Sequence, residues 1–96
     1  MHTIEEIKSF STKIFKQYPI KRASLFGSYA NGKMNENSDI DILIELNKPI
    51  SMLKYIHIQN ELIDLLGKKV DLLQYKMIRP ELKESILANQ VDLYEA

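Results

Sequence analysis

The 96-residue chain is 45% hydrophobic and 27% charged, and it carries no net charge because 13 basic side chains balance 13 acidic ones. This composition predicts one domain over residues 1–96, and the balanced charge argues against direct binding to a long nucleic acid. The absence of cysteine excludes disulfides and thiolate metal sites, and no apolar run approaches the roughly 20 residues of a membrane span. We therefore expect a soluble, cytoplasmic protein.

The first half of the chain predicts a helix followed by two strands. Thr3 begins a capping-box pattern ahead of apolar residues at helical spacing, and Pro19 ends the helix. Residues 23–26 are a brief strand candidate, and residues 27–38 form a loop rich in Gly, Asn and Ser with room for one helical turn. Residues 39–46 alternate acidic and aliphatic side chains, which is typical of a strand with one buried face.

The second half predicts a helix, a strand, a further helix and a short closing strand. Ser51 is the expected cap of the first of these helices and Gly67 its terminator. Its buried side is predicted to contain Met52, Leu53, Ile56, Ile63 and Leu66. Residues 69–73 read as the strand, Pro80 begins the next helix, and residues 91–94 form the last strand. The order predicts an α/β (α+β) single domain with a small mixed β-sheet and helices packed on one face.

A phosphate-binding motif is the first functional candidate. Residues 27–33, GSYANGK, fit the first seven positions of a P-loop, but Met34 stands where the motif needs Ser or Thr. A P-loop also requires a helix directly after its lysine, whereas the residues after Lys33 lack helical periodicity and run into a strand. The P-loop match is therefore accidental.

Three aspartates are the second candidate. Asp39 and Asp41 lie two residues apart on one predicted strand, so their side chains share a face about 6.5–7 Å apart at Cα. Asp71 lies on the next predicted strand, and if the two strands pair, the three carboxylates converge. Such a cluster suits two Mg²⁺ ions. Taken singly, each residue has a structural alternative, such as Asp39 in a turn cap or Asp41 as a solvated strand residue.

The sequence resembles a known family at these positions. Residues 25–32, LFGSYANG, followed by residues 38–44, SDIDILI, resemble the signature of the polymerase-β-type nucleotidyltransferase superfamily. They are most similar to its minimal nucleotidyltransferase (MNT) branch. The resemblance covers nearly the whole chain and implies that superfamily's fold. Asn31 departs from the pattern, since many members carry Arg there.

The resemblance implies a role for each motif residue. Gly27 and Ser28 would hold the β and γ phosphates of ATP through backbone N–H groups and the Ser hydroxyl. Asp39 and Asp41 would ligate both Mg²⁺ ions. Asp71 would ligate the catalytic ion and help to deprotonate the attacking hydroxyl.

Two further residues are candidate nucleotide contacts because of their place in the loop. Tyr29 adjoins Ser28 and is predicted to line the nucleotide pocket. Lys33 follows Gly32 and is predicted to meet the phosphates, although an exposed loop lysine is commonly only solvated.

MNT proteins resemble antitoxins that pair with a HEPN-type ribonuclease toxin and attach AMP to one of its tyrosines. The resemblance thus implies that this chain is a protein adenylyltransferase whose partner is such a toxin. Two alternatives stay open. One is a catalytically idle antitoxin that neutralises its partner by binding, and the other is a nucleotidyltransferase that acts on a small-molecule acceptor.

Overall fold

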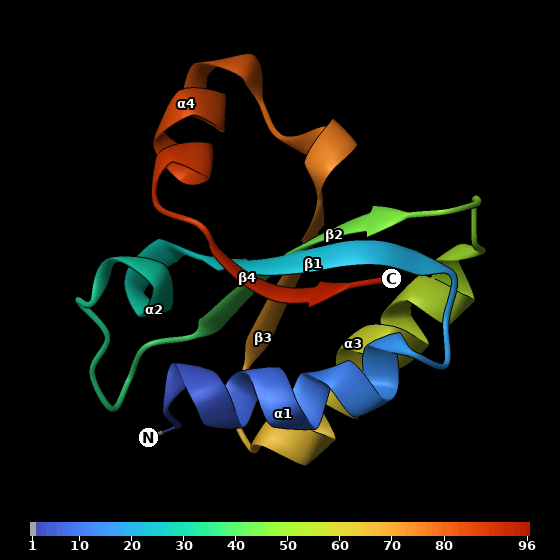
Figure 1. The fold of residues 1–96 in the computed structure, drawn as a ribbon, viewed down its shortest axis with the longest axis horizontal. Coiled ribbons are helices and arrows are strands. Elements are labelled where there is room, and N and C mark those ends of the chain that lie inside the picture. The colour runs from blue at the N-terminus through green and yellow to red at the C-terminus, as the bar shows by residue number, and fades with distance from the viewer. Residues whose placement is uncertain (1) are drawn as a thin grey trace.

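The fold is a four-stranded sheet whose two long helices pack on one face, seen in a computed structural model that describes residues 2–96 (Figure 1). The elements in chain order are α1 (Ile4–Phe15), β1 (Ile20–Phe26), α2 (Gly27–Asn31), β2 (Ile40–Leu46), α3 (Met52–Leu66), β3 (Val70–Gln74), the 3-10 helix η1 (Tyr75–Met77), α4 (Pro80–Ala88) and β4 (Val91–Glu95). Within the described residues, no helix has the length and apolar character that a membrane crossing needs.

The sheet is mixed, as the sequence predicts, with strand order β3-β2-β1-β4. β1 pairs antiparallel with both β2 and β4, whereas β2 and β3 run parallel. A parallel pair needs a crossover connection, and α3 supplies it between β2 and β3. The amino-terminal ends of β2 and β3 therefore lie at the same edge of the sheet as the carboxy-terminal end of β1.

Hydrogen bonds confirm the predicted starts of the two long helices and the predicted end of α3, whereas α1 ends at Phe15, before Pro19. Thr3 accepts a hydrogen bond from the Glu6 backbone, and the Glu6 side chain accepts one from the Thr3 backbone, which completes the capping box of α1. Ser51 caps α3 by accepting from the Lys54 backbone. Gly67 ends α3 in the left-handed conformation at φ 67°.

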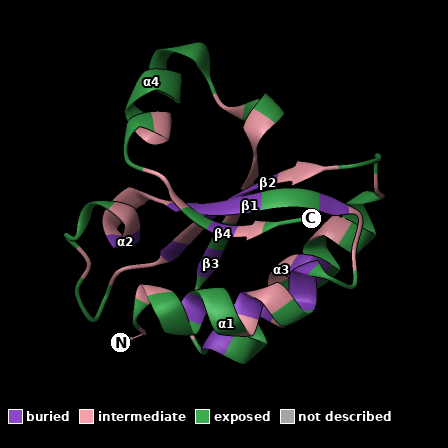
Figure 2. Cartoon of the chain, in the orientation of Figure 1, coloured by how far each residue is buried: buried purple, intermediate pink, exposed green. Residues whose placement is uncertain are grey.

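The hydrophobic core lies between one face of the sheet and the helices α1 and α3 (Figures 1 and 2). From the helices, Ile7, Phe15, Ile58 and Leu62 are fully buried there. The prediction for α3 is wrong at its amino-terminal end, because Met52 is 71% exposed, Leu53 81% and Ile56 43%. The helix directs its next turns, rather than its first, against the sheet.

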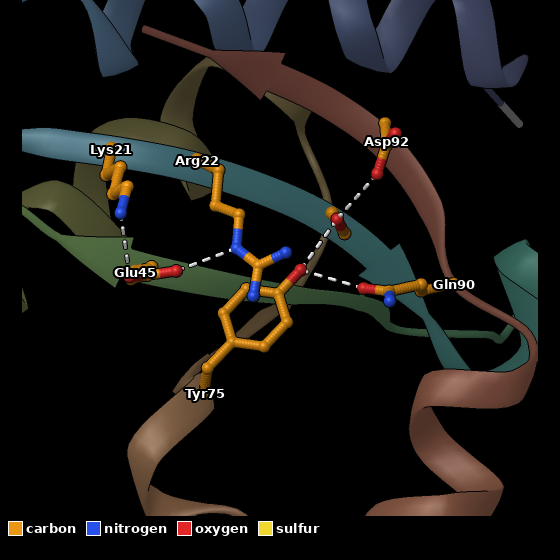
Figure 3. Close-up of polar contacts among 7 residues, drawn as sticks. Lys21, Arg22, Glu45, Tyr75, Gln90 and Asp92 are labelled. Carbon is orange, nitrogen blue, oxygen red and sulfur yellow. Dashed lines mark hydrogen bonds and ion pairs between the residues drawn. The ribbon is translucent and has the colours of Figure 1, made fainter.

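The second face of the sheet is partly covered by a polar network around Tyr75 (Figure 3). The Tyr75 hydroxyl lies 2.8 Å from both Ser24 Oγ and Gln90 Oε1, and the Arg22 guanidinium carbon lies 4.1 Å from the centre of the Tyr75 ring. These contacts tie η1 to β1 and to the start of β4. Leu43 of β2, which pairs with Ser24, is fully buried.

Two elements differ from their predicted extents. β1 begins at Ile20 rather than Ala23, because antiparallel pairing with β2 extends as far as Ile20 and Leu46. The segment predicted as a loop begins with a five-residue helix, α2, that ends at Gly32 with φ 78°.

Candidate active site

Strand pairing brings two of the predicted site residues together. Asp41 is the second residue of β2 and Asp71 the second residue of β3, and the parallel register makes them direct partners. On its other side, Asp41 pairs with Phe26, the last residue of β1. β1 ends at Phe26 and the chain turns at Gly27. This turn therefore lies beside the two carboxylates, at one end of the strands.

Gly27 touches Asp41 so closely that no side chain fits between them. A Cβ atom placed on Gly27 would overlap the Asp41 carboxylate oxygen and lie 3.1 Å from its Cγ. Gly27 also has φ 69°, a conformation that residues with a side chain rarely adopt. Glycine is therefore required here both by backbone conformation and by the neighbouring carboxylate.

The electrostatics of the cluster favour a bound cation. Burial, followed by the neighbouring Asp71 carboxyl and the charge of Asp39, raises the pKa of Asp41 to about 6, and the charge of Lys69 opposes this shift. Carboxylates that repel one another in this way are stabilised by a divalent cation between them. The donor set of Asp41 and Asp71 therefore fits Mg²⁺.

Asp39 is held slightly apart from the other two. Its Oδ2 lies 3.7 Å from Lys69 Nζ in an ion pair. Among residues 2–96, no three His, Cys, Asp or Glu side chains are grouped closely enough to hold a metal ion as they stand. Three-carboxylate ligation would thus require Asp39 to turn from Lys69 towards Asp41.

The start of α2 offers backbone donors beside the carboxylates. Phe26, the residue at its amino-terminal cap, makes no side-chain capping hydrogen bond. The first N–H groups of any helix lack partners within the helix, and in α2 these belong to Gly27, Ser28 and Tyr29. Such donors, next to a glycine and a half-buried serine, suit the oxygens of a phosphate.

The two other predicted nucleotide contacts are placed differently from one another. Lys33 is exposed, and its backbone N–H donates to the Ser28 carbonyl and to Asn31 Oδ1, at 3.0 Å each. Tyr29 is fully buried in the core, and its contact with a nucleotide stays a prediction. Its hydroxyl has no hydrogen-bond partner in the described part of the chain.

Two lysines that the sequence analysis left without a site role lie beside this cluster. Lys69 pairs with Asp39, and Lys68 donates a hydrogen bond of 3.0 Å to the Glu36 carbonyl while lying 6.0 Å from the Tyr29 ring centre. Both residues immediately precede β3. Their position two and three residues before Asp71 is the signal that could have placed them here.

The fold, together with the pair of carboxylates at the ends of β2 and β3, is that of a nucleotidyltransferase. A family model described as "Polymerase beta, Nucleotidyltransferase" matches residues 9–96, and the chain belongs to that family.

Several individual proteins resemble the chain over almost its whole length. A Methanocaldococcus jannaschii protein assigned as a protein adenylyltransferase is 46% identical over 90 residues, which cover 94% of this chain and 97% of that protein. The protein adenylyltransferase MntA of Thermococcus cleftensis is 33% identical over 95 residues, covering 95% and 96% of the two chains.

Solved structures show the same fold. A structure assigned to a minimal nucleotidyltransferase has a TM-score of 0.78 at 25% identity and covers 94% of this chain and 95% of its own. A toxin–antitoxin complex with AMP-PNP has a TM-score of 0.79 at 22% identity, covering 93% of this chain and 73% of that chain. A complex of a tri-AMPylated Shewanella oneidensis HEPN toxin with an MNT antitoxin has a TM-score of 0.75 at 18% identity, with 98% and 74% covered.

Proposed function

We propose that this protein transfers AMP from ATP to a tyrosine hydroxyl of a HEPN-type partner and thereby acts as its antitoxin. The observation that carries the proposal is the in-register pairing of Asp41 with Asp71 against the Gly27 turn. The relatives named as protein adenylyltransferases support the reaction, and the neighbouring toxin–antitoxin complexes support the partner.

Each residue has a role that follows from its place. The turn at Gly27 and Ser28 holds the β and γ phosphates through the free N–H groups of α2 and the Ser28 hydroxyl. Asp39, Asp41 and Asp71 would hold two Mg²⁺ ions. The chemistry that bound Mg²⁺ supplies is neutralisation of the phosphate charge and activation of the attacking oxygen. Lys33, exposed beside the turn, can reach the phosphates from solvent.

The reaction forms one bond and breaks one. The acceptor oxygen attacks the α-phosphorus in line, and the bond from that phosphorus to the bridging oxygen of the β-phosphate breaks, releasing pyrophosphate. The exposed carboxylate of Asp71 helps to take the proton of the attacking hydroxyl. Most of the rate would come from positioning and electrostatic stabilisation, as is general for phosphoryl transfer.

The test uses ATP labelled at either the α or the γ phosphate, with Mg²⁺ and the HEPN-type protein encoded beside this chain. We expect label from the α position on the partner, and we expect Asp41→Asn to lower the rate by about a hundredfold or more, the size of effect that follows loss of an electrostatic group at a reacting centre. Transfer of label only from the γ position would overturn the proposal. Tight inhibition of the partner without any transfer would indicate an antitoxin that acts by binding alone.

A further inference from the structure

Large apolar side chains are exposed at the end of the sheet opposite the carboxylates. Met52 and Leu53 begin α3, and Met77 ends η1; their exposed fractions are 71%, 81% and 63%. In Figure 1, η1 and the start of α3 lie on the side of the molecule away from α2. Exposed apolar side chains in one neighbourhood are a mark of an interaction surface.

The surface is hollowed rather than flat. A groove of about 270 Å³ is lined by Met52, Tyr55, Leu73, Gln74 and Met77, among others. A second hollow of about 330 Å³ adjoins it, because Gln74 lines both. We call the two together the Gln74 groove. Its first part offers apolar contacts, and the second part brings Lys48 and Lys76 to its rim.

The charge around the Gln74 groove is mainly basic, although the whole chain is neutral. Residues 46–60 and 72–80 contain no Asp or Glu, and their basic side chains are Lys48, Lys54, Lys76 and Arg79. The acid that does line the groove, Glu45, is already engaged by Arg22 at 2.8 Å and by Lys21 at 3.6 Å (Figure 3). A partner that complements this rim must be acidic.

The groove favours a helix over an added strand as its occupant. β3 is an edge strand, and edge strands can recruit an extended peptide through their free backbone groups. Here the Leu72 carbonyl accepts from the Tyr55 hydroxyl at 2.6 Å, and the Val70 carbonyl accepts from Gln59 Nε2 at 2.8 Å. These two α3 side chains occupy two of the β3 carbonyls that would otherwise accept from a new strand. An occupant would therefore bind through its side chains, as an amphipathic helix does.

We propose that the Gln74 groove docks an acidic amphipathic helix of the protein acceptor. The proposal rests on the proposed function, because only a protein acceptor needs such a surface. Gln74 lies three residues beyond Asp71 on β3, about 10 Å along the strand. A partner held at the groove can therefore extend another segment to the carboxylates, and the groove sets affinity for the acceptor without touching the nucleotide.

Two double variants test this surface, Met52→Asp with Met77→Asp and Lys48→Glu with Lys76→Glu. The matched controls are Leu65→Asp, another exposed apolar residue of α3, and Lys16→Glu, an exposed lysine after α1. Steady-state AMP transfer to the HEPN-type protein encoded beside this chain gives KM and kcat, and binding of Mg²⁺-ATP without the partner is measured in parallel. Circular dichroism and thermal unfolding verify that each variant folds.

We expect each groove variant to raise KM for the partner by at least about tenfold, as loss of central interface residues does. Values of kcat and ATP binding should stay within twofold of the wild type, and both controls should behave as the wild type. The wild-type KM should rise with salt, and this rise should be smaller in the lysine variant.

The outcomes separate the two proposals. If the wild type modifies the partner and the folded groove variants keep its KM, the docking surface is wrong and the proposed function stands. If the wild type binds the partner without modifying it and the groove variants lose binding, the docking surface is supported and the proposed reaction is wrong. If the wild type neither binds nor modifies the partner, both are overturned.

Discussion

Asp41 and Asp71 are direct partners in the parallel pairing of β2 with β3, and the neighbouring Asp71 carboxyl, together with burial, raises the pKa of Asp41. Two acidic side chains at adjacent positions of one sheet face repel each other once both are ionised. The pair therefore carries strain at neutral pH that a proton or a cation relieves. Gly27 lies directly against the Asp41 carboxylate and keeps it in this position.

Asp41 should make the free energy of unfolding fall as the pH rises. Its pKa is raised from 3.8 to about 6 in the folded protein, so the folded state prefers the protonated form. The stabilisation that the protonated Asp41 side chain contributes is fully present below about pH 4, and it is lost as the pH rises through about 6. We therefore expect Asp41→Asn to be more stable than the wild type at pH 7 by about 1–2 kcal/mol, after allowance for solvent screening of a partly exposed group.

Urea unfolding at several pH values between 4 and 7 measures this difference. It should shrink as the pH falls and be near zero at pH 4. Glu45→Gln is the control on the same strand, since the pKa of Glu45 is lowered by its hydrogen bond to Arg22 and its contribution has the opposite sign. If Asp41→Asn is less stable than the wild type at pH 7, the ionised Asp41 carboxylate does not destabilise the folded state.

Mg²⁺ should stabilise the wild type through the same carboxylates. A cation that binds only the folded state adds about 1.4 kcal/mol at a concentration ten times its Kd. We expect the midpoint of thermal unfolding to rise with Mg²⁺ at pH 7 in the wild type and to stay constant in Asp41→Asn. Chelation by EDTA should abolish AMP transfer. An equal rise in both proteins would place the cation elsewhere.

Gly27→Ala should inactivate the protein, whereas Gly67→Ala should not. Both glycines have positive φ, 69° and 67°, so each substitution costs about 1–2 kcal/mol of backbone strain. The new Cβ at Gly27 would also overlap the Asp41 carboxylate, whereas at Gly67 it would meet no atom of the described residues within 4 Å beyond the adjoining backbone.

Both glycine variants are compared by thermal unfolding and by AMP transfer. This comparison distinguishes the effect of backbone strain from the effect of displacing the Asp41 carboxylate. We expect similar losses of stability and a selective loss of activity in Gly27→Ala. Equal activity in the two variants would show that Asp41 does not need its present position.

Tyr29→Phe should leave ATP affinity unchanged. The Tyr29 side chain is fully buried, and its hydroxyl lacks a hydrogen-bond partner among the described residues. Removing an unsatisfied buried hydroxyl is expected to be neutral or to stabilise the fold by up to about 1 kcal/mol. Urea unfolding and titration with Mg²⁺-ATP check both points. A marked loss of ATP affinity would indicate that Tyr29 contacts the nucleotide, as the sequence analysis predicted.

Local hydrogen bonding made several elements predictable from the sequence. The capping box at Thr3, the cap at Ser51 and the glycine terminator at Gly67 depend on residues within one or two turns, and all three are confirmed. The short helix α2 was expected only as one turn within a loop, because its five residues show no hydrophobic periodicity. It is stabilised by packing of Tyr29 into the core, which no local pattern signals.

Burial was predicted less well than element type. Helical periodicity assigned Met52 and Leu53 to the inner side of α3, but both lie beyond the area that the sheet covers. The strand pattern of residues 39–46 placed alternate aliphatic residues inside, yet Leu43 on the other face is also fully buried. Its strand partner Ser24 is hydrogen-bonded to Tyr75, a residue distant in the chain, so packing on this face depends on tertiary contacts (Figure 3).

The sequence by itself determined the element types, their caps and the spacing of Asp39 and Asp41, because these depend on neighbours along the chain. Tertiary structure alone decided that β3 lies beside β2 in the register that joins Asp41 to Asp71, that Asp39 pairs with Lys69, and that the first turn of α3 stays exposed. Strand order and register depend on which faces can be buried together, a property of the whole core rather than of any single segment.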